Sequence, residues 1–228
     1  MGLDAYSLLR PVFSVFWNCR LSGRRNIPDV GPAVFVSNHL GSYAPLAVLS
    51  AFPVRLYPWV VHQVVDWRLC ADYLRLDFIE PELRLKPPLS KVAAWAISGA
   101  CLALMKFLRA VPVYEKSMRL ATTWKQSVEL LNGKKFLVIF PENGSRPDPE
   151  ARPVNEFDQG FVGVAALYYK KTGRILNFIP VAVNKAARVI TIGPPISYKP
   201  ENKLALESER IATALRDKII ALCASPER

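Results

Sequence analysis

The sequence predicts an α/β fold: a mostly parallel central sheet flanked by helices, with an N-terminal membrane-associating helical segment. Strand-like and helix-like segments alternate along the 228 residues, as in folds that pair a parallel sheet with helices. Hydrophobic residues make up 51% of the chain, which is enough for a substantial core and argues against disorder. Residues 3–19 are rich in Leu, Phe and Trp, which favours a helix lying on an apolar surface.

The elements follow one another with short connections, and no internal repeat, low-complexity tract or linker interrupts residues 23–228. One α/β domain is therefore expected there. Its strands are predicted at 33–37, 55–65 (interrupted by Pro58), 111–114, 134–142, 175–184 and 188–196. Its helices are predicted at 45–52, 117–131, 160–173 and 201–223. The longest apolar segment, 92–105, is shorter than the roughly 18 residues that span a bilayer, so a buried helix is expected.

Residues 1–22 are expected to form a separate amphipathic segment, a possible membrane anchor. Its apolar part is followed by Arg20, Arg24 and Arg25, as expected for a segment that faces anionic headgroups. Two interpretations stay open: a helix docked on the protein's own core, or an interfacial anchor. The N-terminus lacks the basic start, apolar stretch and cleavage pattern of a secretory signal.

The formal net charge of +11 predicts an anionic partner. The basic residues are spread along the chain without a nucleic-acid recognition motif, so an anionic membrane surface is favoured and no nucleic acid is expected. Four scattered cysteines, with no CxxC pair, indicate buried free thiols in a reducing compartment. Neither a metal site nor a bound cofactor is indicated.

His39 stands where the strand at 33–37 meets the helix at 45–52. Side chains at the carboxyl end of a strand face the crevice in which α/β proteins bind ligands. A neutral imidazole at such a corner can accept a proton from a substrate hydroxyl. Asn38 and Ser42 flank His39, and Ser42 could cap the helix. A histidine that only bonds the helix entrance is the structural alternative.

A second polar cluster follows the strand at 134–142. Its residues offer an acid, an amide, a free backbone, a hydroxyl and a guanidinium: Glu142, Asn143, Gly144, Ser145 and Arg146. This set suits a phosphate or a polyol, because a guanidinium can bind two oxygens and a glycine lets the backbone approach. A solvated Asn-Gly turn is the structural alternative.

These pieces, in this order, resemble the glycerolipid acyltransferases, that is, the lysophosphatidate acyltransferases and their relatives. GRRNIP (23–28) is similar to the family's lead-in G-x-E-N-I-P, and SNHLGSYAP (37–45) to its block of His, four residues and Asp. VPVY (111–114) occupies the second block, and FPENGSR (140–146) resembles F-P-E-G-T-R. IPVAV (179–183) matches the fourth block and GPPI (193–196) the late turn. The resemblance covers about residues 15 to 200.

The resemblance implies an O-acyltransferase of phospholipid biosynthesis, with an acyltransferase-like domain at 23–228. His39 would remove a proton from the hydroxyl of a lysophospholipid or related glycerolipid, which attacks an acyl thioester. The donor would be acyl-CoA or acyl carrier protein. Asn38, Ser42, Lys116 and residues 142–146 would bind the substrate. The enzyme would sit on the cytoplasmic face of the membrane as a peripheral or monotopic protein.

Three departures from the family pattern bear on catalysis. Ala44 stands where the Asp that orients the histidine is expected. In serine hydrolases, spoiling the orienting Asp lowers the rate by about four orders of magnitude. Glu115, with Lys116 beside it, occupies the position of the second-block Arg, and Asn143 is an extra residue after Glu142. Ser145 replaces a Thr and keeps the hydroxyl.

Two explanations for Ala44 follow. In the first, His39 still works, oriented by a backbone carbonyl, by the hydroxyl of Ser42 or Tyr43, or by an acid from elsewhere such as Asp66. In the second, the chain is a catalytically impaired member of the family that binds lipid or acyl groups without turnover.

Overall fold

The computed structural model describes residues 18–114, 119–142 and 154–224. The chain divides into two compact units. The sheet unit joins Met1–Leu56 to Trp124–Arg228, and the helical unit is Tyr57–Thr123. Most of the expected N-terminal anchor, residues 1–17, lies outside the described residues.

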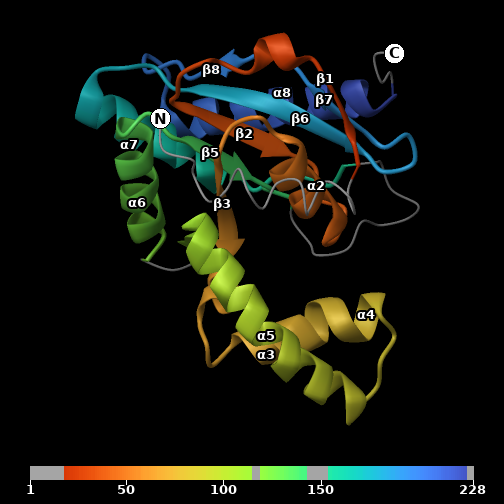
Figure 1. Ribbon diagram of the computed structural model, residues 1–228. Coiled ribbons are helices and arrows are strands. Elements are labelled where there is room, and N and C mark those ends of the chain that lie inside the picture. The colour runs from red at the N-terminus through yellow and green to blue at the C-terminus, as the bar shows by residue number, and fades with distance from the viewer. Residues whose placement is uncertain (1–17, 115–118, 143–153, 225–228) are drawn as a thin grey trace. The chain divides into compact units, whose positions relative to one another are not determined.

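The sheet unit has a mixed, mostly parallel sheet in the order β1-β7-β6-β2-β5, with β8 also paired to β6 (Figure 1). β2 is parallel to both β5 and β6, and β1 is parallel to β7, whereas β7 and β8 run antiparallel to β6. The strands are β1 Arg20–Ser22, β2 Ala33–Ser37, β5 Phe136–Ile139, β6 Asn177–Asn184, β7 Val189–Ile192 and β8 Ile196–Ser197. The predicted fold class is confirmed, apart from the membrane-associating segment.

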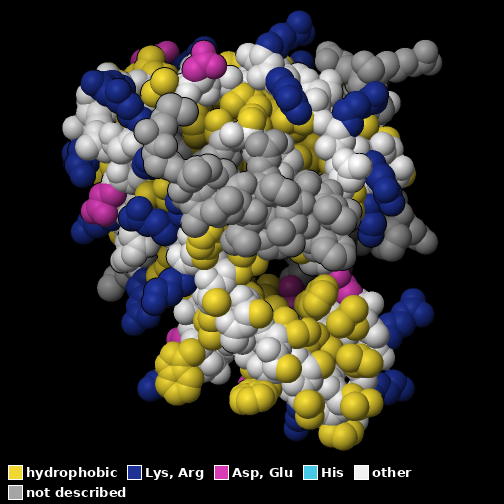
Figure 2. Space-filling model, in the orientation of Figure 1, with side chains coloured by type: hydrophobic (Ala, Val, Ile, Leu, Met, Phe, Trp, Pro, Cys, Tyr) yellow, Lys and Arg dark blue, Asp and Glu magenta, His cyan; other side chains and the backbone are white. Residues whose placement is uncertain are grey.

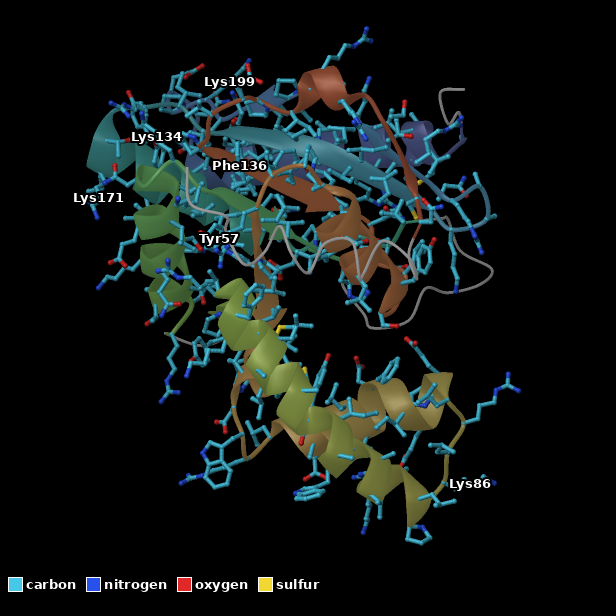
Figure 3. The ribbon with its side chains drawn as sticks, in the orientation of Figure 1. Tyr57, Lys86, Lys134, Phe136, Lys171 and Lys199 are labelled. Atoms are coloured by element: carbon cyan, nitrogen blue, oxygen red, sulfur yellow. The ribbon has the colours of Figure 1, made fainter. Side chains whose placement is uncertain are left out.

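Both faces of this sheet are covered, which explains why β2 is buried at all five positions. Alternate side chains of a strand point to opposite faces. Phe35 therefore points into the core on the side of α2 (Tyr43–Ala51). Its ring packs edge-on against that of Phe52, the residue after α2, with 5.0 Å between ring centroids. Phe136 of β5, labelled in Figure 3, lies in the same core.

The other face of the sheet is covered by α8 (Leu204–Ala224), which packs on β6, and by the short helix η4 (Gln159–Val162) (Figure 1). The ring of Phe161 in η4 packs edge-on against that of Phe178 in β6, with 5.5 Å between ring centroids. The remaining helices are η1 Arg24–Asn26, α6 Leu120–Asn132 and α7 Gly163–Thr172. Lys134, Lys171 and Lys199 lie exposed on the outside of the unit (Figure 3).

The helical unit contains two parallel strands and a group of helices. β3 (Leu56–Val61) pairs with β4 (Val111–Val113), with Trp59 opposite Val111. Between these strands lie η2 His62–Val65, α3 Cys70–Leu74, the π-helical turn η3 Arg75–Ile79, α4 Glu80–Glu82 and α5 Leu89–Leu108. α5 packs on α3, η3 and η2.

The prediction for the longest apolar segment, residues 92–105, is wrong. The helix α5 runs over 20 residues, Leu89–Leu108, because flanking residues extend it at both ends. It is not a buried helix. Only 11% of its 18-residue apolar window is buried, and by length and composition the helix could cross a membrane. It is the one helix of this kind among the residues that the structure describes.

The other elements differ from prediction mainly at their ends. The strand expected at 188–196 is divided into β7 and β8, because Pro194 and Pro195 have no N–H to donate to the neighbouring strand. Residues 62–65 form a 3₁₀ helix instead of continuing β3. Ser42 does not cap α2, since its side chain makes no capping hydrogen bond. All four cysteines are free; only Cys70 is fully buried.

The start of α8 depends on the buried Glu207. Arg210 donates to its carboxylate at 2.8 Å, and Asn202 and the backbone N–H of Lys199 donate at 2.7 Å each. These bonds, that from Arg210 above all, outweigh burial and lower the pKa of Glu207 to about 2.

We predict that Glu207→Gln lowers the free energy of unfolding at pH 7 by about 1–3 kcal/mol. The pKa is lower in the folded state, so the carboxylate stabilises the fold above its unfolded pKa. This contribution is lost as the pH falls toward 2. Urea unfolding between neutral pH and pH 3 should show the difference from wild type shrinking. Glu209→Gln, at an exposed neighbouring position, is the control; a pH-independent difference for Glu207→Gln would contradict the prediction.

Candidate active site

The candidate site lies at the carboxyl ends of β2 and β5. These strands are parallel neighbours, with Val36 opposite Ile139, so the residues that follow them leave the sheet at the same edge. Asn38 and His39 follow β2, whereas Phe140 and Glu142 follow β5. The structure thus brings together residues that are separated by about 100 positions in the sequence.

Asn38 fixes the end of β2 to β6. Its side-chain amide donates to the carbonyl of Val183 at 3.1 Å, and its carbonyl oxygen accepts the N–H of Val183 at 2.8 Å. Asn38 is 1% exposed, so no water replaces these bonds. The pair sets the position from which the next residue, His39, leaves the sheet.

His39 is held through its backbone by Glu142. The N–H of His39 donates to Oε1 of Glu142 at 2.6 Å, and the N–H of Asn155 donates to Oε2 at 3.1 Å. The imidazole meets the ring of Phe140 edge-on, with 5.7 Å between ring centroids. The chain then turns through Gly41, whose φ of 54° is left-handed and favours glycine, and enters α2.

Burial shapes the electrostatics of Glu142. It raises the pKa of this carboxyl, while the two backbone donors and the positive charge of Arg216 offset part of the rise. Arg216 lies on α8 and donates through Nε to the carbonyl of Asn155 at 3.1 Å. Burial, together with the negative charge of Glu142, raises the pKa of the Cys223 thiol to about 11, so this cysteine is protonated at neutral pH.

Position 44 lies in the apolar core. Ala44 is 0% exposed and packs among the side chains of α2, β2 and β6. The methyl group offers no acceptor to an imidazole. The hydroxyl of Tyr43 shares a hydrogen bond of 3.2 Å with the Cys19 thiol, while Lys185 lies over its ring at 5.1 Å. Asp66, in the helical unit, accepts the backbone N–H of Arg68 at 2.9 Å.

Of the residues predicted for the site, Asn38, His39, Ser42 and Glu142 are described, and the hydrogen bond between His39 and Glu142 joins two of the predicted blocks. Lys116, Asn143, Gly144, Ser145 and Arg146 lie outside the described residues. Their binding roles stay predictions.

The sequence interpretation missed Asn155, Arg216 and Cys223. Arg216 donates a hydrogen bond to the carbonyl of Asn155, and the negative charge of Glu142 contributes to the raised pKa of the Cys223 thiol. No sequence motif marks these three positions. The sequence indicates only that Arg216 and Cys223 lie on the same C-terminal helix, α8. Among the described residues, no group of three His, Cys, Asp or Glu could hold a metal ion.

Comparison with known proteins supports the fold. No family model and no curated protein matches the chain. Among solved structures, the chain is similar to the 1-acyl-sn-glycerophosphate (LPA) acyltransferase PlsC from Thermotoga maritima, with a TM-score of 0.53 and 15% sequence identity. The match covers 95% of this chain and 80% of that chain. The mixed α/β fold with a mostly parallel sheet is therefore one that an acyltransferase also has.

We predict that Asn38→Ala lowers the free energy of unfolding by about 2–4 kcal/mol, because it leaves both backbone groups of Val183 buried without their partners. Asn184→Ala is the matched control. Asn184 also makes two hydrogen bonds to backbone groups, to Cys223 and Ala187, but it is only half-buried, so water can replace them. Urea unfolding of both variants would contradict the prediction if the two losses were equal.

Proposed function

We propose that the chain is an O-acyltransferase. It would move a fatty acyl group from an acyl thioester, acyl-CoA or acyl carrier protein, to the hydroxyl of a lysophospholipid or related glycerolipid. The observation that carries the proposal is the hydrogen bond from the His39 backbone to Glu142. It joins the two sequence blocks that resemble acyltransferase motifs, on a fold shared with an LPA acyltransferase.

In the proposed reaction His39 is the general base. Its imidazole takes the proton of the acceptor hydroxyl as the oxygen attacks the thioester carbonyl. The carbon–sulfur bond then breaks, and the imidazolium returns the proton to the departing thiolate. Glu142 acts as a positioning residue, since its carboxylate is already occupied by the backbone donors of His39 and Asn155.

Acceptor binding is assigned to the polar residues around this corner. Arg146 and Lys116 would bind a phosphate or other anionic headgroup, and Asn143, Gly144 and Ser145 would supply further donors. Ser42 would line the same end of β2, whereas Asn38, which the sequence also suggested for binding, is buried and bonded to Val183 and would act by holding that end in place. An acceptor embedded in a bilayer places the enzyme at a membrane, for which we propose the cytoplasmic face.

A second candidate function rests on Ala44. Alanine stands where the aspartate that orients the histidine is found in the acyltransferases that the sequence resembles. Its side chain is buried in the apolar core and offers no acceptor to the imidazole. A catalytically impaired protein that binds lipid or acyl groups without turnover would tolerate this loss.

We predict that His39→Ala lowers kcat for acyl transfer by at least about 100-fold, the usual contribution of a general base. The measurement is thiol release from acyl-CoA and acyl carrier protein across a panel of lysolipids. His62→Ala is the control, since this other histidine stacks on Tyr114 in the helical unit at 5.2 Å. Turnover that survives His39→Ala would reject the general base, and lipid binding without any turnover by the wild type would favour the second function.

We predict that Ala44→Asp raises kcat above that of Ala44→Asn, because only the carboxylate would stabilise the imidazolium. Both variants place a polar group in the core, so Ala44→Asn should lower the free energy of unfolding by about 1–3 kcal/mol, and Ala44→Asp should lower it further because a charge costs more to bury. Steady-state kinetics and urea unfolding would be measured together. Equal kcat in the two variants would indicate that another group already orients His39.

A further inference from the structure

The helical unit exposes an unusual amount of apolar surface. Of the 13 large hydrophobic side chains that are exposed among the described residues, eight lie between Trp67 and Ile97. We define the apolar surface of the helical unit by the six that are most exposed: Trp67, Leu76, Leu83, Leu89, Val92 and Trp95. Figure 2 shows apolar side chains gathered over this unit.

The polarity of α5 is inverted relative to that of a helix of a water-soluble protein. Its buried residues are Ser90, Ala94, Ser98 and, at its end, Leu108, whereas Leu89, Val92 and Trp95 are 66%, 65% and 77% exposed. A surface helix in water turns its apolar stripe inward.

The buried serines of α5 have partners within the unit. Ser90 donates to Glu80 at 2.9 Å, and Ser98 donates to the carbonyl of Trp95 at 2.8 Å. The hydroxyl groups on the packed side of α5 therefore have hydrogen-bond partners. The apolar side chains on its outward side are exposed, and an apolar environment would cover them.

The charges along α5 and the connection before it favour an anionic lipid surface, whereas residues 66–82, on which α5 packs, carry five acidic and two basic residues. Residues 83–109 contain five basic residues and no acidic residue: Arg84, Lys86, Lys91, Lys106 and Arg109. All five are exposed, and Lys86 stands in the connection before α5 (Figure 3). Long basic side chains beside an apolar helix can reach phosphate headgroups while their stems lie on the acyl chains.

The two exposed tryptophans fit the same environment. Trp67 is 73% exposed, with Arg68 over its ring at 5.1 Å, and Trp95 is 77% exposed. Indole rings favour the boundary between headgroups and acyl chains. A second copy of the chain fits less well, because a symmetric contact would bring the same five cations together.

The helical unit would lie in the plane of the membrane surface. α5 is about 30 Å long, enough to cross the hydrocarbon layer. However, it packs on α3 and η3, where Arg75 pairs with Glu80 at 3.0 Å and Asp72 is exposed. A spanning α5 would draw these charges into the bilayer, which is strongly unfavourable.

We propose that the apolar surface of the helical unit docks in-plane on a bilayer that contains anionic phospholipid. This docking site is separate from any anchor in residues 1–22, and it does not depend on acyl transfer.

The test is flotation of the full-length protein with vesicles of phosphatidylcholine, alone or mixed with phosphatidylglycerol. We expect tighter binding to the mixed vesicles and weaker binding at high salt. Val92→Glu combined with Trp95→Glu should weaken binding to the mixed vesicles by about tenfold or more, because two exposed apolar groups become anions. Leu204→Glu combined with Leu206→Glu is the matched control on α8, where both residues are exposed.

A second variant tests the charges and leaves the apolar residues in place. Lys91→Gln combined with Lys106→Gln should weaken binding to the mixed vesicles by about 30-fold, at roughly 1 kcal/mol per basic residue, and leave binding to phosphatidylcholine unchanged. Circular dichroism and thermal unfolding check that each variant is folded.

Several outcomes would overturn the proposal. One is wild-type vesicle binding by both helical-unit variants, which would leave residues 1–22 as the sole anchor. Another is an equal loss in the α8 control. A third is a concentration-dependent dimer in sedimentation without lipid that Val92→Glu with Trp95→Glu abolishes, since the surface would then bind a second copy. All of these measurements report lipid or self-association, so a failed acyl-transfer assay does not affect them.

Discussion

The site of the sheet unit depends on one carboxylate. Glu142 accepts the backbone N–H groups of His39 and Asn155, and so ties the segment after β2 to the segment that follows its own strand. Partial burial raises the pKa of the Glu142 carboxyl, and the two backbone donors and the positive charge of Arg216 offset part of the rise. Burial and the negative charge of Glu142 in turn raise the pKa of the Cys223 thiol. The backbone hydrogen bond to Glu142 by itself fixes where His39 leaves the strand end. This separates the position of His39 from the question of what orients the imidazole.

Alanine at position 44, where the sequence resemblance leads us to expect an aspartate, is compatible with the fold because α2 uses that position for packing. Ala44 belongs to the core between α2, β2 and β6, and the first turn of α2 follows directly from the turn at Gly41. The end of β2 is held instead by Asn38, whose amide bonds both backbone groups of Val183. Backbone hydrogen bonds from Asn38 and Glu142 therefore set the geometry of the corner, and a side-chain acid at position 44 is not needed for it.

The helical unit shows the opposite arrangement of polarity. Its helix α5 buries serines and exposes leucine, valine and tryptophan, with cations and no anions along residues 83–109. An acyltransferase that uses membrane-embedded acceptors would benefit from a unit held at the lipid surface, since enzyme and acceptor would then share one layer. The proposed docking and the proposed chemistry are thus consistent with each other, although each rests on different residues.

The sequence by itself determined the class of fold and the main strands, because β2 and β6 are short apolar runs rich in β-branched residues, which are typical of strands in a covered sheet. It also placed His39 and Glu142 after two separate strands, but the bond between the backbone of one and the side chain of the other depends on β2 and β5 being parallel neighbours. The tertiary structure alone decided that Asn38 bonds Val183, that Arg216 and Cys223 belong to the site, and that α5 faces outward. An apolar run has the same composition whether it is buried or exposed, so only its packing partners distinguish a core helix from an exposed apolar helix.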